Sequence, residues 1–554
     1  MASAVKNMAS SGRARVVLLL TALALVPAAF PLRAASPPQA VQSAAAATRP
    51  NILLIISDDI GIDATSGMYP GLLEGLTQRY GPSGLNHPAY RSISGHPAST
   101  PNLNQLARQG ITFSNVWAQP FCSPTRASIL TGLFAGKVNV INYTDPLSQH
   151  HTSFVQRLRD EGGYSTGLFG KWHLSGMPGG AQPYPGMKPR EAGFEYFRGN
   201  LHAAIRGYWD YEYFVQDAGT PADQWRVEQP PLKSLPGIAP TRFADVVKVA
   251  DALEWIGGRE RAAPARPWFA WVAFNLAHAT SNQQPSAMAV PDADLLDAPS
   301  RAEMRACNGT FGTNTTGSCT GEALNRAMTN AHDTLLGKLL AGVEALDANT
   351  IVIYVGDNGT PMYGRPNLDM IDSLYITRKG RGKGTAYESG ARVPLAIRGP
   401  GIGAARSSGE FVHVVDLFPT ILEMAGLKAP AKVASGDGKG SFDVDGVSLL
   451  PIVNGRAQRL RDPDQGYLLT ESLNLMTNST RQVAARNGSY KVICTEKVEH
   501  DACQFFSLAE DPLEEFPLPH PATCGSGLAV KDPAWHYCRL ANLIRTESFF
   551  ARGR

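Results

Sequence analysis

Three apolar runs of strand length, each ending in polar residues, limit what this chain can fold into. They are NILLIISDD (51–59), PWFAWVAFNLAH (267–278) and NTIVIYVGDNG (349–359). Helical patterns lie between them, at 99–110, 151–163 and 322–346. Strands that alternate with helices predict an α/β fold, in which helices cover both faces of a sheet. Such sheets place their sites at the carboxyl ends of strands, which is where these polar residues cluster.

The last part of the chain has a different pattern. The stretches at 466–472, 481–494 and 503–512 are typical of short strands joined by turns, and Asn487-Gly488 indicates a hairpin. A chain of 554 residues is too long for one ordinary core. We therefore predict a catalytic domain at 49–464 and a small C-terminal α+β domain at 465–554. Residues 61–99, rich in Gly, Pro and Tyr, are predicted to form a long loop over a pocket.

The N-terminus has the pattern of an export signal. Lys6, Arg13 and Arg15 precede the apolar run at 16–30, and small residues follow it. We predict a signal peptide and an Ala-rich linker at 1–48. A single N-terminal anchor is the alternative, but the run is short and contains Pro27. The protein is expected to be exported, to the periplasm or the medium, or to the lysosome or secretory pathway of a eukaryote, without a stable membrane span.

Composition excludes one class of partner. The net charge is +3, charged residues make up 18% of the chain, and lysine and arginine form no run. Nucleic acid is therefore not the predicted partner.

The cysteines agree with an oxidising compartment, because six of the seven fall into three close sequence pairs. The simplest of the fifteen pairings joins neighbours: Cys307 with Cys319, Cys494 with Cys503, and Cys524 with Cys538. Cys122 is left over under every pairing, and an unpaired thiol in an exported protein calls for a function.

Two strand ends are candidate metal ligands. Asp58 and Asp59 end one predicted strand, and Asp357 and Asn358 end another. Four oxygen donors could converge on a hard cation, Ca²⁺ or Mg²⁺. Each pair alone is also a common turn or helix cap. Zinc is disfavoured because the histidines are scattered along the sequence.

Cys122 lies in FCSPTRASILTG (121–132), a pattern that places it at the start of a helix. Pro124 suits the first turn of a helix and Gly132 its end. The amide groups of the first turn favour an anion, and Arg126 adds a positive charge one turn later. The alternative is an inert, buried cysteine.

This stretch closely resembles the signature of the formylglycine-dependent (type I) sulfatases, arylsulfatase-like members of the alkaline-phosphatase-like superfamily. The resemblance continues in the family's order through most of the chain, in the stretches 51–59, 100–115, 163–174, 273–279, 355–359, 382–401, 414–426, 445–455 and 505–515. It implies a large mixed sheet between helices and a small C-terminal antiparallel-sheet domain.

The resemblance also implies a function for Cys122. A formylglycine-generating enzyme would oxidise it to an aldehyde, whose hydrate offers a hydroxyl that attacks sulfur. The second hydroxyl would let the intermediate collapse and release sulfate without attack by water. The predicted activity is hydrolysis of a sulfate ester, of a small molecule or a carbohydrate, to an alcohol or phenol plus inorganic sulfate.

Further residues acquire roles by the same resemblance. The modified Cys122 would hold Ca²⁺ (or Mg²⁺) together with Asp58, Asp59, Asp357 and Asn358, and Asp357 would be the base for the attacking hydroxyl. Arg126 and Lys171 would fix negative charge. His173 would take the proton that triggers elimination. His278 and Lys383 would bind sulfate, and one of them would protonate the leaving alcohol. Asn200 or His202 could join the sulfate site.

Two alternatives stay open at this point. A phosphonate or phosphate ester hydrolase of the same superfamily could carry the same oxidised cysteine, and fold alone does not decide between them. A catalytically inactive protein that binds sulfated glycans would need a broken nucleophile or metal set, and the sequence retains both.

Overall fold

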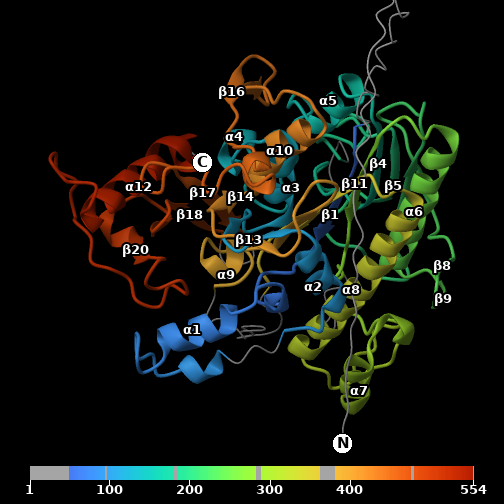
Figure 1. Ribbon diagram of the computed structural model, residues 1–554, viewed down its shortest axis with the longest axis horizontal. Helices are drawn as coiled ribbons and strands as arrows, with labels where there is room; N and C mark the ends of the chain where they lie inside the picture. Colours follow the sequence, from blue (N-terminus) through green and yellow to red (C-terminus); the bar gives the residue numbers. More distant parts are fainter. Residues whose placement is uncertain are drawn as a thin grey trace, which may run out of the picture. The chain divides into compact units, whose positions relative to one another are not determined.

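The computed structural model describes residues 49–93, 97–178, 184–281, 288–361, 381–475 and 479–552 (Figure 1). These residues belong to one compact unit. The predicted signal peptide and linker, at 1–48, lie outside the described residues.

A mixed sheet of ten strands forms the centre, in the order β13-β2-β12-β11-β1-β10-β4-β5-β6-β7. The four strands β11, β1, β10 and β4 pair in parallel, as do β4 with β5 and β13 with β2, while β12, β6 and β7 run antiparallel to their neighbours. The strands are β1 (Asn51–Ser57), β2 (Ile111–Phe113), β4 (Ser165–Lys171), β5 (Tyr196–Asn200), β6 (Tyr213–Gln216), β7 (Arg226–Glu228), β10 (Trp268–Ala273), β11 (Thr350–Gly356), β12 (Leu395–Arg398) and β13 (Arg406–Ser408).

Helices cover both faces of this sheet, which explains why its central strands are apolar throughout. Leu53 and Ile55 of β1 join a core with the helices of one face, α2 (Pro101–Gln109), α6 (Ala244–Ala262) and α8 (Gly321–Leu346). Ile52 and Ile56 join a second core with α3 (Cys122–Thr131), α5 (Phe154–Asp160) and α10 (Leu417–Met424). Alternate side chains of a strand point to opposite faces, so both sets must be apolar. The predicted fold class is confirmed.

A four-stranded antiparallel sheet follows near the C-terminus, in sequence order and with α12 (Pro533–Glu547) packed on it. Its strands are β17 (Leu468–Asn474), β18 (Thr480–Arg486), β19 (Tyr490–Thr495) and β20 (Cys503–Ser507). Asn487 and Gly488 lie in the turn between β18 and β19, as predicted. The domain boundary between residues 464 and 465 stays a prediction.

All three predicted disulfides are present: Cys307–Cys319, Cys494–Cys503 and Cys524–Cys538. Cys122 is free and buried.

The remaining elements are short. They are β3 (Val116–Trp117), β8 (Lys233–Leu235), β9 (Ile238–Thr241), β14 (Val412–His413), β15 (Lys432–Ala434), β16 (Ser441–Asp443), α1 (Leu72–Tyr80), α4 (Ala135–Val138), α7 (Ala298–Ala306), α9 (Glu388–Ala391) and α11 (Leu450–Val453). The prediction of a long loop at 61–99 is wrong for α1, in which buried Leu76 and Tyr80 give an apolar side to a helix between Gly71 and Gly81.

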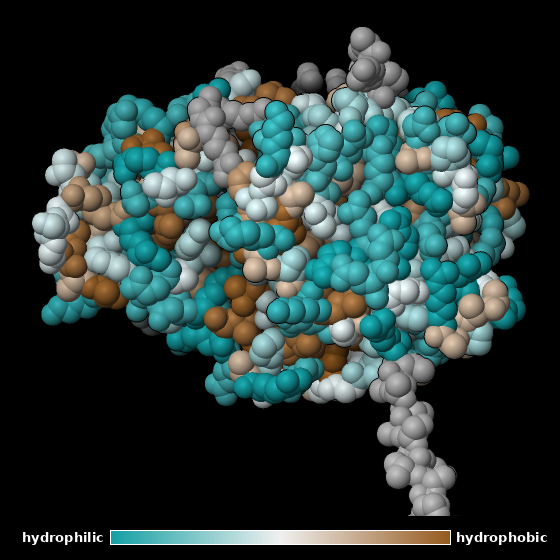
Figure 2. All heavy atoms as spheres, turned by 90° about the horizontal axis from the view of Figure 1, so that it is seen from above, coloured by the Kyte–Doolittle hydropathy of each residue, from teal (hydrophilic) through white to brown (hydrophobic). Residues whose placement is uncertain are grey.

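The surface in Figure 2 is mostly hydrophilic, and hydrophobic side chains gather in separate patches between the polar ones. Within the described ranges, none of the helices is long and apolar enough to cross a membrane.

Candidate active site

Two parallel strands bring the predicted metal ligands together. Ser57, the last residue of β1, pairs with Gly356, the last residue of β11, so the polar residues that follow each strand leave the sheet side by side. Asp59 adopts a left-handed conformation (φ 61°), and its amide donates to Oδ1 of Asp357 at 3.2 Å. This turn keeps both aspartates of the first strand beside the second strand.

The carboxylates of Asp58, Asp59 and Asp357 form a buried cluster, with oxygens that lie within 4.8 Å of one another. Burial and the neighbouring Asp58 charge raise the pKa of Asp357 well above its usual range, although Arg126 opposes them. Oδ1 of Asp58 and Oδ1 of Asn358 are buried and have no hydrogen-bond partner among the described residues. Concentrated negative charge and unsatisfied oxygens are what a hard divalent cation would neutralise, so these residues fit such an ion.

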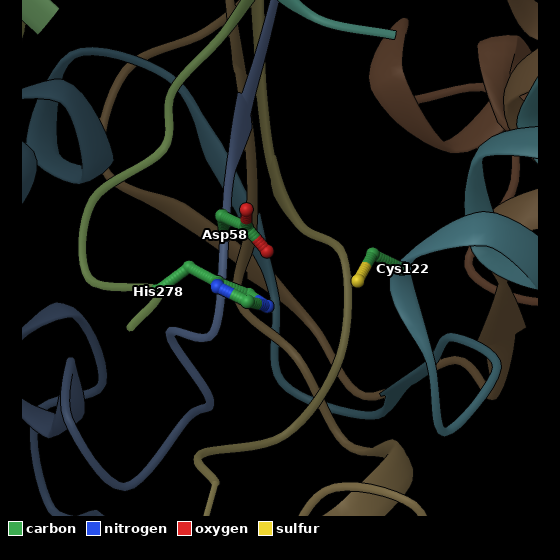
Figure 3. A group of neighbouring side chains, drawn as sticks. All are labelled: Asp58, Cys122 and His278. Carbon is green, nitrogen blue, oxygen red and sulfur yellow. The ribbon is translucent and has the colours of Figure 1, made fainter. Parts of the chain in front are cut away.

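Cys122 faces this cluster from the first turn of α3 (Figure 3). The helix ends at Gly132, whose left-handed φ of 73° terminates it as predicted. One turn after Cys122, the guanidinium of Arg126 donates to Oδ2 of Asp357 at 2.8 Å and to the carbonyl of Lys171 at 2.6 Å. Arg126 thereby joins α3, β4 and the strand end that carries Asp357.

Two lysines reach Cys122 from other elements. Nζ of Lys171, at the end of β4, lies 2.6 Å from Oδ2 of Asp58 and 3.4 Å from Sγ of Cys122. Nζ of Lys383 binds Oδ1 of Asp59 and lies 3.6 Å from the same sulfur. Burial alone would raise the pKa of the Cys122 thiol, but the two ammonium groups and His173 outweigh it and hold this pKa well below its usual range. The position therefore favours a negatively charged atom.

Two histidines complete the set. Nε2 of His173 lies 2.7 Å from the carbonyl oxygen of Tyr143. Because a carbonyl only accepts, Nε2 carries the proton and Nδ1 is left as an acceptor. Burial lowers the pKa of His173 to about 4, so the ring is neutral at pH 7. His278 follows β10 and points towards Asp58 (Figure 3), with Nε2 3.8 Å from Oδ2 of Asp59.

A pocket of about 700 Å³ opens above these groups. Of the predicted residues, Cys122, His173, His278 and Lys383 line it, together with Asn200 and His202. The other predicted residues are fully buried behind the lining: Asp58, Asp59, Arg126, Lys171, Asp357 and Asn358. The fold therefore brings every residue singled out from the sequence into one place.

Comparison with known proteins shows which family the chain belongs to. A family model described as Sulfatase matches residues 50–427, which is more than half of the 554-residue chain. The chain belongs to the sulfatase family. It is 26% identical over 537 residues to the N-acetylgalactosamine-6-sulfatase of Mus musculus, covering 90% of this chain and 85% of that protein. It is 28% identical over 513 residues to arylsulfatase A of Bos taurus, covering 86% and 84%.

Solved structures confirm the fold of this sulfatase. The PsFucS1 sulfatase of Pseudoalteromonas sp. matches it with a TM-score of 0.54 and 20% identity, over 85% of this chain and 86% of that one. The resemblance inferred from the sequence is thus confirmed, and the activity is hydrolysis of sulfate esters. The family in general uses formylglycine and a divalent metal ion.

Sequence reasoning missed part of the sulfatase pocket. Tyr143, Arg206 and Glu212 line it but belong to loops without a recognisable motif. Asn200 and His202 lie in a stretch that no periodic apolar pattern marks. Asn200 is the last residue of β5, so the strand-end rule could have selected it once β5 was recognised.

Proposed function

We propose that this sulfatase uses a formylglycine made from Cys122, together with a cation held by Asp58, Asp59, Asp357 and Asn358. The observation that carries the proposal is the position of Cys122. It lies at the bottom of the pocket, at the N-terminus of α3, with two ammonium groups within 3.6 Å of its sulfur. An inert structural cysteine would not need this electropositive setting.

Ca²⁺ is the proposed ion, with Mg²⁺ as the alternative. The available donors are carboxylate and amide oxygens, which suit hard cations. When bound, the cation lowers the pKa of the attacking hydroxyl and offsets charge on the sulfate oxygens. The formylglycine supplies that attacking hydroxyl and would itself be a ligand through its oxygen.

The surrounding residues hold charge and move protons. Arg126 and Lys171 are fixed by Asp357 and Asp58, so their charge meets negative charge at residue 122 without having to reorganise. Asp357, a carboxylate of the buried cluster, accepts the proton of the attacking hydroxyl. His173, neutral and with Nδ1 as an acceptor, takes the proton whose removal releases sulfate.

His278 and Lys383 form the side of the site from which the leaving group departs. Both line the pocket, and both contact Asp59. They bind the sulfate group, and one of them donates a proton to the departing oxygen, which would otherwise leave as an alkoxide or phenoxide.

The proposed substrate is a sulfated small molecule or carbohydrate that fits the pocket. The mouse relative is named for a sulfated amino sugar, which supports the carbohydrate class. Maturation requires a formylglycine-generating enzyme as a partner. Three disulfides support export to the periplasm, the medium or a secretory compartment.

Mass spectrometry of the tryptic fragment 109–126 from natively expressed protein tests the nucleophile. We expect CHO in place of CH₂SH at residue 122. Turnover of matched aryl sulfate and aryl phosphate esters then tests the bond that is cleaved, and faster phosphate turnover would contradict the proposal. An intact thiol that persists after co-expression with the maturing enzyme would also contradict it.

A further inference from the structure

One wall of the pocket carries a carboxylate that the chemistry above does not use. Glu212 lines the pocket next to His202, and its Oε2 lies 2.6 Å from Nε2 of that ring. The hydroxyl of Tyr184 lies 2.6 Å from the same nitrogen. His202 is thus held from two sides, and Glu212 is held by it. The side chain of Glu212 remains 55% exposed, so its charge faces the solvent of the pocket mouth.

The positive charges that line the pocket are already balanced. Of the lining residues that the structure describes, Lys383 and Arg206 are the lysine and the arginine. Lys383 pairs with Asp59, and Arg206 pairs with Asp210 at 2.6 Å. Glu212 has no lysine or arginine partner within the described part of the chain. Among the described residues of this wall, a second anionic group on the substrate would therefore meet a carboxylate and no unpaired lysine or arginine.

The rest of the lining is largely apolar. Phe121, Met177 and Ile205 contribute to it, and the side chain of Met177 is exposed rather than packed in the core. Apolar and aromatic surface stabilises an uncharged ring or chain in contact with it. It offers nothing to a densely sulfated polymer, which is bound through clustered lysines and arginines.

We propose that this pocket selects esters with a single sulfate and an uncharged leaving group, and that Glu212 is the residue that disfavours a second anion. This inference rests on the proposed function, because it assumes that the leaving group occupies the pocket above Cys122. His202 positions Glu212 by fixing its carboxylate against the wall.

A matched pair of substrates isolates the charge of the leaving group. The amide 4-(carbamoylmethyl)phenyl sulfate and the acid 4-(carboxymethyl)phenyl sulfate have nearly the same size and differ by one negative charge. We expect the wild type to have a higher kcat/KM for the amide. Glu212→Gln should reduce the amide-to-acid ratio about five- to tenfold, the size expected for two charges on the order of 10 Å apart in a partly hydrated pocket. The kcat/KM for the amide should change less than that for the acid.

Asp223→Asn is the control, because it removes an equal charge from an exposed side chain that neither lines the pocket nor pairs with a described residue that does. It should leave the ratio unchanged. Calorimetry in a Cys122→Ala background gives the dissociation constants of the amide and the acid. Their ratio, with and without Glu212→Gln, is then obtained without turnover. Failure of the wild type to hydrolyse either ester while the calorimetric ratios shift as expected would contradict only the proposed function. An unchanged ratio in Glu212→Gln, an equal shift in Asp223→Asn, or no binding of either ester would overturn the inference.

Discussion

At the scale of single residues, the buried cations of the site are each paired with a buried carboxylate. Arg126 and Lys171 are completely buried, and each one is paired with a carboxylate that would otherwise be buried alone. Removing one partner of such a pair leaves an uncompensated buried charge, which is more damaging than the loss of the contact itself. Substitutions here are therefore expected to affect folding and catalysis together.

Arg126→Lys tests whether shape matters as well as charge. The guanidinium reaches Asp357 and the carbonyl of Lys171 at once, whereas a lysine ammonium is compact and cannot span both acceptors. We expect kcat/KM on an aryl sulfate to fall about 10²- to 10³-fold, as for loss of one oriented donor. Arg157→Lys, at a partly exposed ion pair with Glu161, is the control. An Arg126→Lys variant within threefold of the wild type would show that charge alone suffices.

His332 gives the unfolding free energy a defined pH dependence. Burial lowers its pKa to about 3, and the charge of Lys248 adds to this effect. Between pH 6.5 and 3 the unfolded chain binds a proton at this residue that the folded chain does not bind, so stability falls as the pH falls. At pH 4.5 the loss is about 2–3 kcal/mol relative to pH 7.

His332→Gln should remove this part of the acid sensitivity. The difference in free energy of unfolding between pH 7 and pH 4.5, measured with urea, should shrink by that amount in the variant. His150→Gln, at an exposed histidine, should retain the wild-type difference. Equal pH dependence in all three proteins would refute the assignment.

The candidate site residues could be selected from the sequence because each one lies in a recognisable local pattern. Asp58 and Asp357 follow apolar strands, and Cys122 opens a helix with proline and glycine at its two ends. Glu212 could not be predicted in this way. It reaches the pocket through its contact with His202, ten residues away, in a segment without a regular apolar period.

At the scale of elements, the segment after β10 depends on support from α6. The side-chain oxygen of Asn275 accepts a hydrogen bond from the buried ammonium of Lys248. The backbone amide of Asn275 donates to Oδ1 of Asp245 at 2.9 Å. The hydroxyl of Tyr208 lies 2.7 Å from the carbonyl of Asn275 and 2.8 Å from that of His278. These contacts fix the backbone on which His278 is presented to the pocket.

Tyr208→Phe should therefore weaken both stability and catalysis. Loss of the hydroxyl leaves buried carbonyl oxygens with fewer partners, which costs about 1–2 kcal/mol. We expect kcat/KM to fall several-fold, because a misplaced positioning group reduces transition-state contacts. Tyr211→Phe is the matched control, since its buried hydroxyl has no partner among the described residues. Both variants are compared by thermal unfolding and steady-state kinetics. Equal effects of the two substitutions would contradict a positioning role for Tyr208.

Element boundaries could be predicted where local signals are strong and not where packing decides. The helix expected at 322–346 is observed as α8 (Gly321–Leu346), whose apolar side chains recur with a helical period. Helix α1 was missed because Gly75 interrupts it and glycines flank both ends. Tyr80 supports α1 by donating to Asp511 at 2.5 Å, a contact 431 residues distant in sequence that no local pattern could reveal.

At the scale of the whole molecule, the small C-terminal sheet holds the loop that carries Lys383. The carbonyl of Gly384 accepts from Ser472 at 2.7 Å and from Asn474 at 3.1 Å, both in β17. Further along the same loop, the amide of Ala386 donates to Gln482 of β18 at 3.2 Å. The C-terminal part of the chain thus supports the loop of Lys383, while none of its described residues lines the pocket.

A buried ionic group strengthens this junction. Nζ of Lys491, in β19, lies 3.1 Å from Glu388 and 2.6 Å from Glu514, and 4.6 Å from the ring centre of Trp117. Glu388 begins α9, five residues after Lys383, and its amide donates to Glu514 at 2.7 Å. One lysine therefore compensates two buried carboxylates from different parts of the chain.

Lys491→Met tests whether this junction affects catalysis as well as stability. The variant leaves two like charges buried side by side, so we expect the free energy of unfolding to fall by about 3–5 kcal/mol. Because Glu388 belongs to the loop of Lys383, kcat/KM should also fall, measured on protein shown to be folded by circular dichroism. Lys497→Met, at an exposed lysine two residues beyond β19, should change neither quantity.

Adding Glu388→Gln and Glu514→Gln to Lys491→Met removes the uncompensated charges and should restore most of the stability, since neutral partners avoid the desolvation penalty of buried ions. If kcat/KM recovers along with stability, the loop of Lys383 is positioned by packing once repulsion is relieved. If stability returns while kcat/KM stays low, the ionic contacts themselves set the geometry of the lysine. A Lys491→Met variant that loses stability but keeps full activity from the start would contradict any coupling between the C-terminal sheet and the site.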